Sequence, residues 1–174
     1  MPPYSALLKQ ARSASVELSQ ALAAVKPPQA HKIRGTRKQV QKAQATFAAA
    51  AAASAAQQAD AVDAYDAKIA RVQHDLRKLH PPPVVSPAYR TQVQTLEASR
   101  TVGSALAREL RKKTRSHVAV FGRRFTVAAR IAGSVSAQKA QIAAIKAYNH
   151  RVRAIGTLRG GIRLELQRLQ QLTG

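Results

Sequence analysis

Residues 76–87 read Leu-Arg-Lys-Leu-His-Pro-Pro-Pro-Val-Val-Ser-Pro, and this stretch predicts how the chain folds. A helix cannot continue into a run of prolines, because proline lacks the backbone donor and its ring clashes with the preceding turn. No breaker interrupts the residues between Gly35 and this run, which predicts one long helix from about Thr36 to Leu79. Ser86 followed by Pro87 is typical of an N-cap and a first helical position. We therefore expect a hinge here, and a second helix that extends to about Ser116.

A similar hinge stands earlier in the chain, where residues 22–28 read Leu-Ala-Ala-Val-Lys-Pro-Pro. It predicts a first helix over about 4–25 and a repeated helix–hinge–helix unit, with chance similarity in an Ala-, Arg- and Gln-rich chain as the alternative. Further helices are expected over 118–155, with Gly122 and Gly133 as weak points, and over 161–172 after a break at Gly160-Gly161.

The expected fold is all-α, made of elongated helical hairpins or an antiparallel helical bundle, because period-two strand patterns are absent. We expect an N-terminal hairpin with a long Ala-rich helix (1–80) and a basic C-terminal helical region (81–174). Aromatic residues make up only 4% of the chain, which favours close helix–helix packing over a deep interior. The apolar residues expected to pack together are Val93, Leu96, Gly103, Leu106 and Leu110, then Phe121 and Phe125, and finally a stripe of Ile131, Val135, Ile142, Ile145 and Val152.

The charge of the chain is strongly unbalanced, with 29 Lys and Arg residues against 8 Asp and Glu and a formal net charge of +21. Such an excess opposes compaction and is most easily explained by an anionic partner. Residues 1–42 carry net +7 and residues 90–174 carry net +14, whereas residues 43–66 contain no Lys or Arg. Arginine predominates in the C-terminal part, and its planar guanidinium suits phosphate oxygens. A high-GC genome explains the arginine-to-lysine ratio equally well, but not the shortage of acids.

Two groups of basic residues are predicted to contact a polyanion. One precedes and opens the long helix, and the other occupies the helices after the proline run, where several cations recur every seven residues and so share one side of a helix. The dense basic run at 111–115 is also a candidate localisation signal. The alternative for every member is the solvated outer face of a bundle. The candidate nucleic-acid-binding residues are Lys32, Arg34, Arg37, Lys38, Lys42, Arg100, Arg108, Arg111, Lys112, Lys113, Arg115, Arg123, Arg124, Arg130, Lys139, Lys146 and Arg153.

Motifs for catalysis or metal binding are missing from the sequence. The absence of cysteine excludes disulfides, thiolate zinc sites and cysteine nucleophiles. The five histidines show no metal-ligand spacing, and no Ser-His-Asp set or Gly-rich phosphate loop is present. Asp60, Asp63 and Asp66 stand three residues apart and are expected to form a solvated row, or an internal partner for a basic helix, rather than a cation site. We expect a non-enzymatic protein with no cofactor, no metal and no small-molecule substrate.

Targeting signals are weak. No run of eighteen apolar residues predicts a transmembrane helix, and the N-terminus lacks the apolar core of a secretory signal. The N-terminus is basic and Ser-rich, as in mitochondrial presequences. A location in the cytoplasm, the nucleoid or an organellar matrix is therefore expected.

The hinge pattern Leu-x-x-Leu-x-Pro-Pro and residues 140–155 (AQIAAIKAYNHRVRAI) resemble high-GC actinobacterial helical-hairpin proteins of the cell envelope, over about residues 66–172. In composition the chain is also similar to lineage-specific basic helical subunits of ribosomes and to nucleoid-compacting proteins. The resemblance implies a helical structural protein and brings no defined chemistry with it.

Our leading hypothesis is a structural protein that binds the phosphate backbone of RNA or DNA in a ribosomal or nucleoid-type assembly. Single-strand binders usually interleave aromatic and basic residues, and this chain does not. One alternative is a helical scaffold subunit of an envelope, membrane-surface or respiratory assembly, with its charge facing anionic lipid or acidic protein subunits. Another is a genome-binding protein inside a virion.

Overall fold

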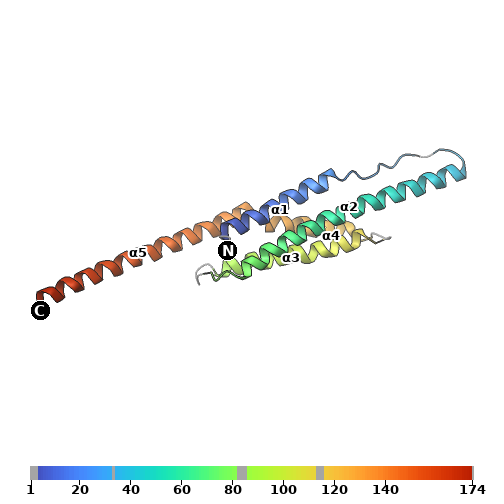
Figure 1. Ribbon diagram of the computed structural model, residues 1–174. Helices are drawn as coiled ribbons and strands as arrows, with labels where there is room; N and C mark the ends of the chain where they lie inside the picture. Colours follow the sequence, from blue (N-terminus) through green and yellow to red (C-terminus); the bar gives the residue numbers. More distant parts are fainter. Residues whose placement is uncertain (1–3, 33, 82–85, 113–115, 174) are drawn as a thin grey trace. The chain divides into compact units, whose positions relative to one another are not determined.

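The computed structural model describes residues 4–32, 34–81, 86–112 and 116–173, and it confirms the all-α fold (Figure 1). Contacts divide the chain into two compact units, the first holding α1, α2, α4 and α3 from Arg90 onward, the second holding α5 and the first turn of α3. Within the described ranges there is no strand, and no helix is long and apolar enough to cross a membrane. The helices are α1 (Tyr4–Ala24), α2 (Arg37–Arg77), α3 (Ser86–Leu110), α4 (Val118–Ala132) and α5 (Val135–Thr173).

Helix α2 begins at a capping box. The backbone N–H of Gln39 donates to Thr36 Oγ1 at 3.4 Å, and the Gln39 side chain accepts from the Thr36 backbone N–H at 2.9 Å. Gly35 precedes the cap with φ of 150°, a backbone conformation that residues with a Cβ rarely adopt. The helix ends at Arg77, shortly before the proline run, as the sequence predicts. Its first half is mostly exposed, and the alanines there keep it helical through their high intrinsic propensity.

Helix α1 packs on α2 within the first unit (Figure 1). The chain leaves α1 after Ala24 and runs without regular structure before α2 begins. Because the buried residues of α2 start only at Ser54, the packing involves its C-terminal half. Glu17 of α1 forms an ion pair with Lys68 of α2. Helices α1 and α2 thus pack against each other as two helices joined by an irregular connection.

Helices α2 and α3 run antiparallel. At the C-terminal end of α2, Arg77 pairs with Glu97, near the middle of α3, at 3.4 Å. Further back along α2, Asp60 pairs at 2.7 Å with Arg111, which directly follows α3. Partner numbers therefore rise on α3 as they fall on α2, which is the pattern of a helical hairpin.

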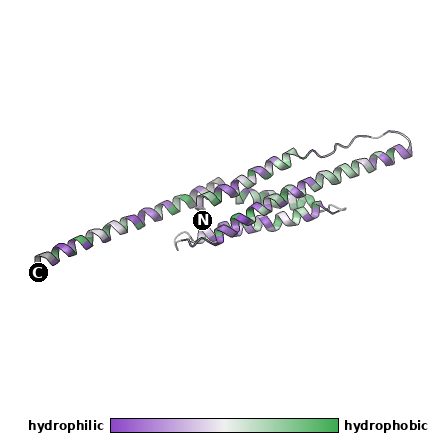
Figure 2. Ribbon diagram, in the orientation of Figure 1, coloured by the Kyte–Doolittle hydropathy of each residue, from purple (hydrophilic) through white to green (hydrophobic). Residues whose placement is uncertain are grey.

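Buried residues of α1, α2, α3 and α4 form the core of the first unit. The Tyr65 and Phe125 rings pack edge to face with centroids 5.6 Å apart. The Tyr65 hydroxyl donates to Ser99 Oγ at 3.2 Å, and burial raises the pKa of Tyr65. A Cβ built on Gly103 would lie 3.0 Å from Phe125 Cε2, so the glycine permits this close approach. Figure 2 shows hydrophobic residues along these helices. The expected packing is confirmed for Leu96, Gly103, Leu106, Leu110 and Phe125, which are buried, whereas Val93 and Phe121 are only half-buried.

The expected C-terminus of α3 at about Ser116 is wrong, because the helix ends at Leu110. The buried Glu109 carboxylate accepts the backbone N–H of His117 at 3.2 Å. His117 is the N-cap residue of α4, so this contact holds the start of α4 close to the end of α3.

The expected single helix over 118–155 is also wrong, because it divides at Gly133-Ser134 into α4 and α5, although Gly133 is one of the two expected weak points. A Cβ on Gly133 would lie 3.0 Å from Ser15 Oγ of α1, so a larger residue would fit there only if Ser15 shifted. The expected stripe from Ile131 to Val152 is consequently interrupted, and Ile131 is 51% exposed. The expected break at Gly160-Gly161 does not occur, since α5 continues through both glycines.

Candidate nucleic-acid interface

Each of the eight acidic side chains of the chain forms an ion pair with a cation of the same chain. An acid so paired does not neutralise other basic residues. The pairs are Glu17–Lys68, Asp60–Arg111, Asp63–Arg111, Asp66–Arg100, Asp75–Lys78, Glu97–Arg77, Glu109–Lys112 and Glu165–Arg168.

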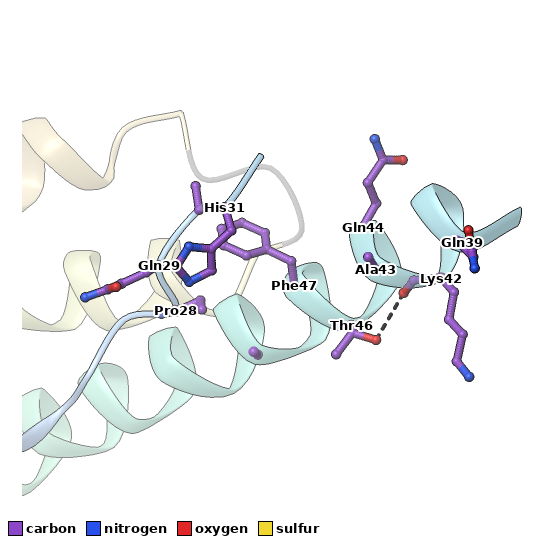
Figure 3. Close-up of a pocket in the computed structure, with 11 residues that line it drawn as sticks. Pro28, Gln29, His31, Gln39, Lys42, Ala43, Gln44, Thr46 and Phe47 are labelled. Atoms are coloured by element: carbon purple, nitrogen blue, oxygen red, sulfur yellow. Dashed lines mark hydrogen bonds between the residues drawn. The ribbon is translucent and has the colours of Figure 1, made fainter. Parts of the chain in front are cut away.

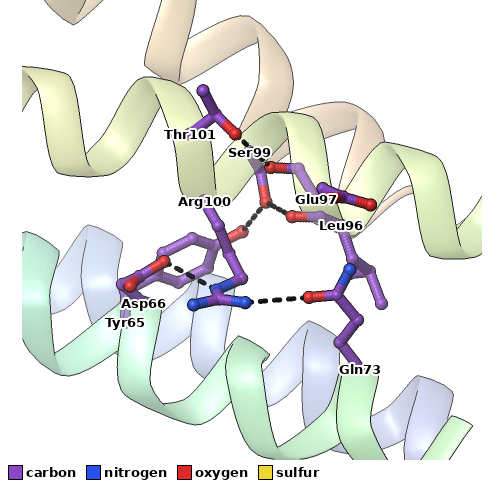
Figure 4. Close-up of polar contacts among 8 residues, drawn as sticks. All are labelled: Tyr65, Asp66, Gln73, Leu96, Glu97, Ser99, Arg100 and Thr101. Atoms are coloured by element: carbon purple, nitrogen blue, oxygen red, sulfur yellow. Dashed lines mark hydrogen bonds and ion pairs between the residues drawn. The ribbon is translucent and has the colours of Figure 1, made fainter. Parts of the chain in front are cut away.

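The predicted phosphate contact Arg100 lies in a polar network between α2 and α3 (Figure 4). Its Nε donates to Asp66 Oδ1 at 3.0 Å, and its Nη1 donates to Gln73 Oε1 at 2.9 Å. The Arg100 side chain is 35% exposed and that of Asp66 is 22% exposed. A guanidinium held by a carboxylate and an amide on a neighbouring helix joins those helices, and its donors already point inward.

A second predicted contact, Arg111, is also held internally. Its Nη2 lies 2.7 Å from Asp60 Oδ1 and 2.7 Å from Asp63 Oδ2, and hydrogen bonds to Asp63 and Asp60 raise the pKa of Arg111. The expectation that the aspartate row is an internal partner for a basic helix is thereby confirmed for Asp60, Asp63 and Asp66. In the described ranges, no three His, Cys, Asp or Glu residues form a group that would hold a metal ion.

The basic run at the end of α3 is only partly described. Lys112 Nζ pairs at 2.6 Å with the buried Glu109 carboxylate, and this contact is the main reason that the pKa of Glu109 is lowered. Arg108 is exposed, and its Nε donates to the Ser104 carbonyl of the preceding turn at 3.3 Å. Lys113 and Arg115 lie outside the described residues.

The other cations of the described ranges are all exposed, and none of them is in an ion pair there. An exposed cation without a carboxylate neighbour keeps its full charge for an external anion. These residues are Lys9, Arg12, Lys26, Lys32, Arg34, Arg37, Lys38, Lys42, Arg71, Arg90, Arg108, Arg123, Arg124, Arg130, Lys139, Lys146, Arg151, Arg153, Arg159 and Arg163.

The first group of available cations is the N-terminal cluster, which comprises Lys32, Arg34, Arg37, Lys38 and Lys42. It spans the end of the α1–α2 connection and the first turns of α2 (Figure 3). The positive end of the α2 dipole adds to its field. A pocket of about 740 Å³ adjoins it, and Phe47, His31 and Lys42 are among the residues that line the pocket.

The second group is the α4 cluster, which comprises Arg123, Arg124 and Arg130. Arg123 and Arg130 are seven residues apart and lie on the side of α4 opposite the buried Phe125. Arg123 and Arg124 also border a groove of about 560 Å³ between α3 and α4. Three guanidinium groups thus project from one short helix.

The third group is the α5 cluster, which comprises Lys139, Lys146 and Arg153. Each is exposed, and the seven-residue steps place them along one side of the helix, as expected. It belongs to the second unit, whereas the other two clusters belong to the first.

The predicted set leaves out several exposed cations with no acidic partner in the described ranges, including Lys9 and Arg12 of α1 and Arg71 of α2. Lys9 and Arg12 could have been predicted from the sequence as available cations, because the N-terminal 42 residues contain only one acid, Glu17. Comparisons with protein-family models, with curated proteins and with solved structures find no match to this chain.

Proposed function

We propose that this protein is a non-enzymatic structural protein that binds the phosphate backbone of nucleic acid, in an assembly of ribosomal or nucleoid type. The observation that carries the proposal is the complete pairing of its carboxylates. The eight acids are all used in internal ion pairs, so the exposed cations of three clusters have no acidic neighbour to neutralise them. Self-repulsion of this size is relieved when phosphates bind.

The chemistry of the clusters supports contact with phosphates rather than with bases. Arginine offers parallel N–H donors that match phosphate oxygens, and lysine adds a point charge. The aromatic residue closest in sequence to the α4 cluster, Phe125, is 2% exposed and serves the core, so it offers that cluster no stacking platform. Near the N-terminal cluster, Phe47 is a single aromatic side chain that is 40% exposed. Binding should therefore be driven by counterion release and should depend weakly on base sequence.

The cations divide into two roles under this proposal. Arg100, Arg111 and Lys112 connect helices or stabilise helix ends, because each pairs with a carboxylate of the chain. The N-terminal, α4 and α5 clusters contact the polyanion. Substitution of the first set should therefore act on stability, and substitution of the second set on affinity.

Salt dependence of binding tests the proposal. Fluorescence anisotropy with a labelled duplex DNA and with a labelled duplex RNA of equal length would be measured between 50 and 200 mM salt. If about 6–10 phosphates are contacted, affinity falls roughly 10³- to 10⁵-fold over this range. A flat salt response on both duplexes would overturn the proposal, and the ratio of the two affinities identifies the preferred nucleic acid.

A second candidate function is a helical scaffold that faces anionic lipid, and the exposed apolar residues of α5 favour it. Leu158 is 68% exposed and Leu164 is 59% exposed. Flotation with phosphatidylglycerol vesicles, in competition with duplex, separates the candidates. Recovery with the vesicles in the presence of excess duplex would favour the scaffold.

A further inference from the structure

Helix α5 carries an apolar repeat in steps of three and four residues, which we name the α5 seam. The steps alternate without interruption over more than three heptads, the length that is typical of a coiled coil. Arg159 is the single position that is not apolar. The members of the α5 seam are Ile145, Tyr148, Val152, Ile155, Arg159, Ile162, Leu166 and Leu169.

The C-terminal half of the α5 seam is exposed. Val152 is 47% exposed, Ile155 57%, Ile162 62% and Leu166 55%. Figure 2 shows green and purple residues alternating along this helix. Exposed large apolar side chains that line up on one face of a helix mark an interaction surface, whereas single scattered ones need no explanation.

The geometry of the α5 seam fits a helix better than a bilayer. Five of the seven exposed large apolar residues described on α5 lie in the α5 seam. Alternating three- and four-residue steps form the narrow surface of a coiled coil, whereas an interfacial membrane helix presents a wider apolar face that often includes Trp or Phe. Residues 149–173 contain no Trp, Tyr or Phe. Arg159 lies in the middle of the stripe, where a bilayer would have to accommodate a guanidinium.

The charge around the α5 seam identifies the chemistry of the partner. Between residues 145 and 170 there are six cations and one acid, Glu165, which already pairs with Arg168 at 2.7 Å. A second copy of α5 would place like charges against each other and would bury Arg159 without a carboxylate. Desolvating an unpaired charge is costly, and a polar residue at one core position selects its partner.

We propose that the α5 seam docks an acidic amphipathic helix of another protein, which has its own three–four apolar repeat and a carboxylate facing Arg159. This inference does not rest on nucleic-acid binding. The α5 cluster lies at heptad positions outside the α5 seam, so one helix has room for phosphates on one side and a protein helix on another.

Synthetic four-heptad peptides test the inference on the full chain. The acidic probe has Ile and Leu at its core positions, Glu at the flanking positions and one core Glu placed to face Arg159. A second probe is identical except for Lys at that core position, and a third has Lys at all flanking positions. We expect saturable binding of the acidic probe, with affinity reduced about tenfold or more for either lysine probe.

Two matched variants locate the contact. Leu166→Gln changes a seam residue, whereas Leu164→Gln changes a leucine of the same helix that is 59% exposed and lies outside the α5 seam. Both side chains are exposed, so circular dichroism should show unchanged helicity. We expect Leu166→Gln to lower the affinity for the acidic probe about tenfold, and Leu164→Gln to lower it less than about twofold. Arg159→Leu should abolish the preference for core Glu over core Lys.

Four results would overturn the inference. In the first, the acidic probe fails to bind. In the second, both leucine variants lower the affinity for the acidic probe equally. Sedimentation equilibrium shows a dimer that Leu166→Gln dissociates, which assigns the α5 seam to a second copy. Phosphatidylglycerol vesicles displace the acidic probe, which assigns it to a lipid surface. Duplex binding measured in parallel should be unchanged in Leu166→Gln, so failure here stays distinguishable from failure of the proposed function.

Discussion

Arg100 Nε lies 3.0 Å from Asp66 Oδ1, and this ion pair joins α3 to α2. The sequence predicts Arg100 as a phosphate contact because it stands in a basic helix with few acids. The fold instead brings an aspartate from 34 residues away against it. The same relationship recurs between Arg111 and the pair Asp60 and Asp63. The acidic stretch of α2 thus neutralises Arg100 of α3 and Arg111, which follows α3, and leaves other cations available.

Arg100→Gln should destabilise the protein more than it weakens binding. It removes hydrogen bonds to Asp66 and Gln73, and leaves a carboxylate that is only 22% exposed without its partner. We expect the free energy of unfolding to fall by about 1–2 kcal/mol in urea titration. Arg130→Gln is the control, with a change within about 0.5 kcal/mol and a measurable loss of duplex affinity. Equal stability of the two variants would contradict the assignment of Arg100 to the fold.

Gly103 and Gly122 should respond differently to alanine. Both lie inside helices, where alanine is favoured over glycine by up to about 1 kcal/mol. A Cβ at Gly122 meets nothing within 4 Å, whereas one at Gly103 approaches Phe125 Cε2 to 3.0 Å. We expect Gly122→Ala to raise the midpoint temperature of thermal unfolding. Gly103→Ala should raise this temperature less than Gly122→Ala does, or lower it. A Gly103→Ala midpoint at or above that of Gly122→Ala would show that Phe125 does not pack against α3 as described.

Glu109→Gln should change the pH dependence of stability. In the folded protein, contacts with Lys112 and with the His117 backbone lower the pKa of Glu109 below its ordinary value of 4.5. A carboxyl group whose pKa is lower in the folded than in the unfolded state stabilises the fold at pH values above its unfolded pKa. This stabilisation is lost as the pH falls through the pKa of the folded state.

Urea titrations between pH 7 and pH 3 measure this effect. The wild type should be more stable than Glu109→Gln at neutral pH, and the difference should shrink as the pH falls below about 4. Glu165→Gln, in a pair whose carboxylate is 64% exposed, is the control and should follow the wild type closely. A constant difference between wild type and Glu109→Gln at all pH values would argue against an ionised Glu109 in the fold.

Gly160 and Gly161 should tolerate alanine and resist proline. Neither has any atom within 4 Å of an added Cβ, and both lie inside α5. The double change to alanine should raise the helical circular dichroism signal by removing two unfavourable helix residues. Gly161→Pro should lower it, because proline breaks the helix interior. Random-coil Cα chemical shifts at both glycines in the wild type would contradict a continuous α5.

Local signals in the sequence were sufficient for the boundaries of α2. The capping residue Thr36 and the proline run after Leu79 act within one or two turns, so they are readable without the fold. The packing of Leu96, Leu106 and Leu110 follows from spacing alone, because a helix presents such positions on one side.

Tertiary contacts decided what the sequence did not predict. Gly133 and Gly160 are the same residue type, yet the chain breaks at Gly133, which faces Ser15 of α1, and continues at Gly160, which faces open space. The end of α3 depends on the carboxylate of Glu109 reaching His117 eight residues later. The pairing of Arg100 and Arg111 depends on acids of another helix, which no local pattern encodes.

The most direct test of the central claim compares salt slopes of duplex binding for two variants. Arg123→Gln/Arg124→Gln/Arg130→Gln removes the α4 cluster, and Arg100→Gln removes a cation held internally. We expect the slope of log K against log salt to become shallower by about 0.9 for each phosphate that the triple variant no longer neutralises, and to stay unchanged in Arg100→Gln. An unchanged slope in the triple variant, or an equally shallower slope in both variants, would contradict the division of the basic residues into internal and phosphate-binding sets.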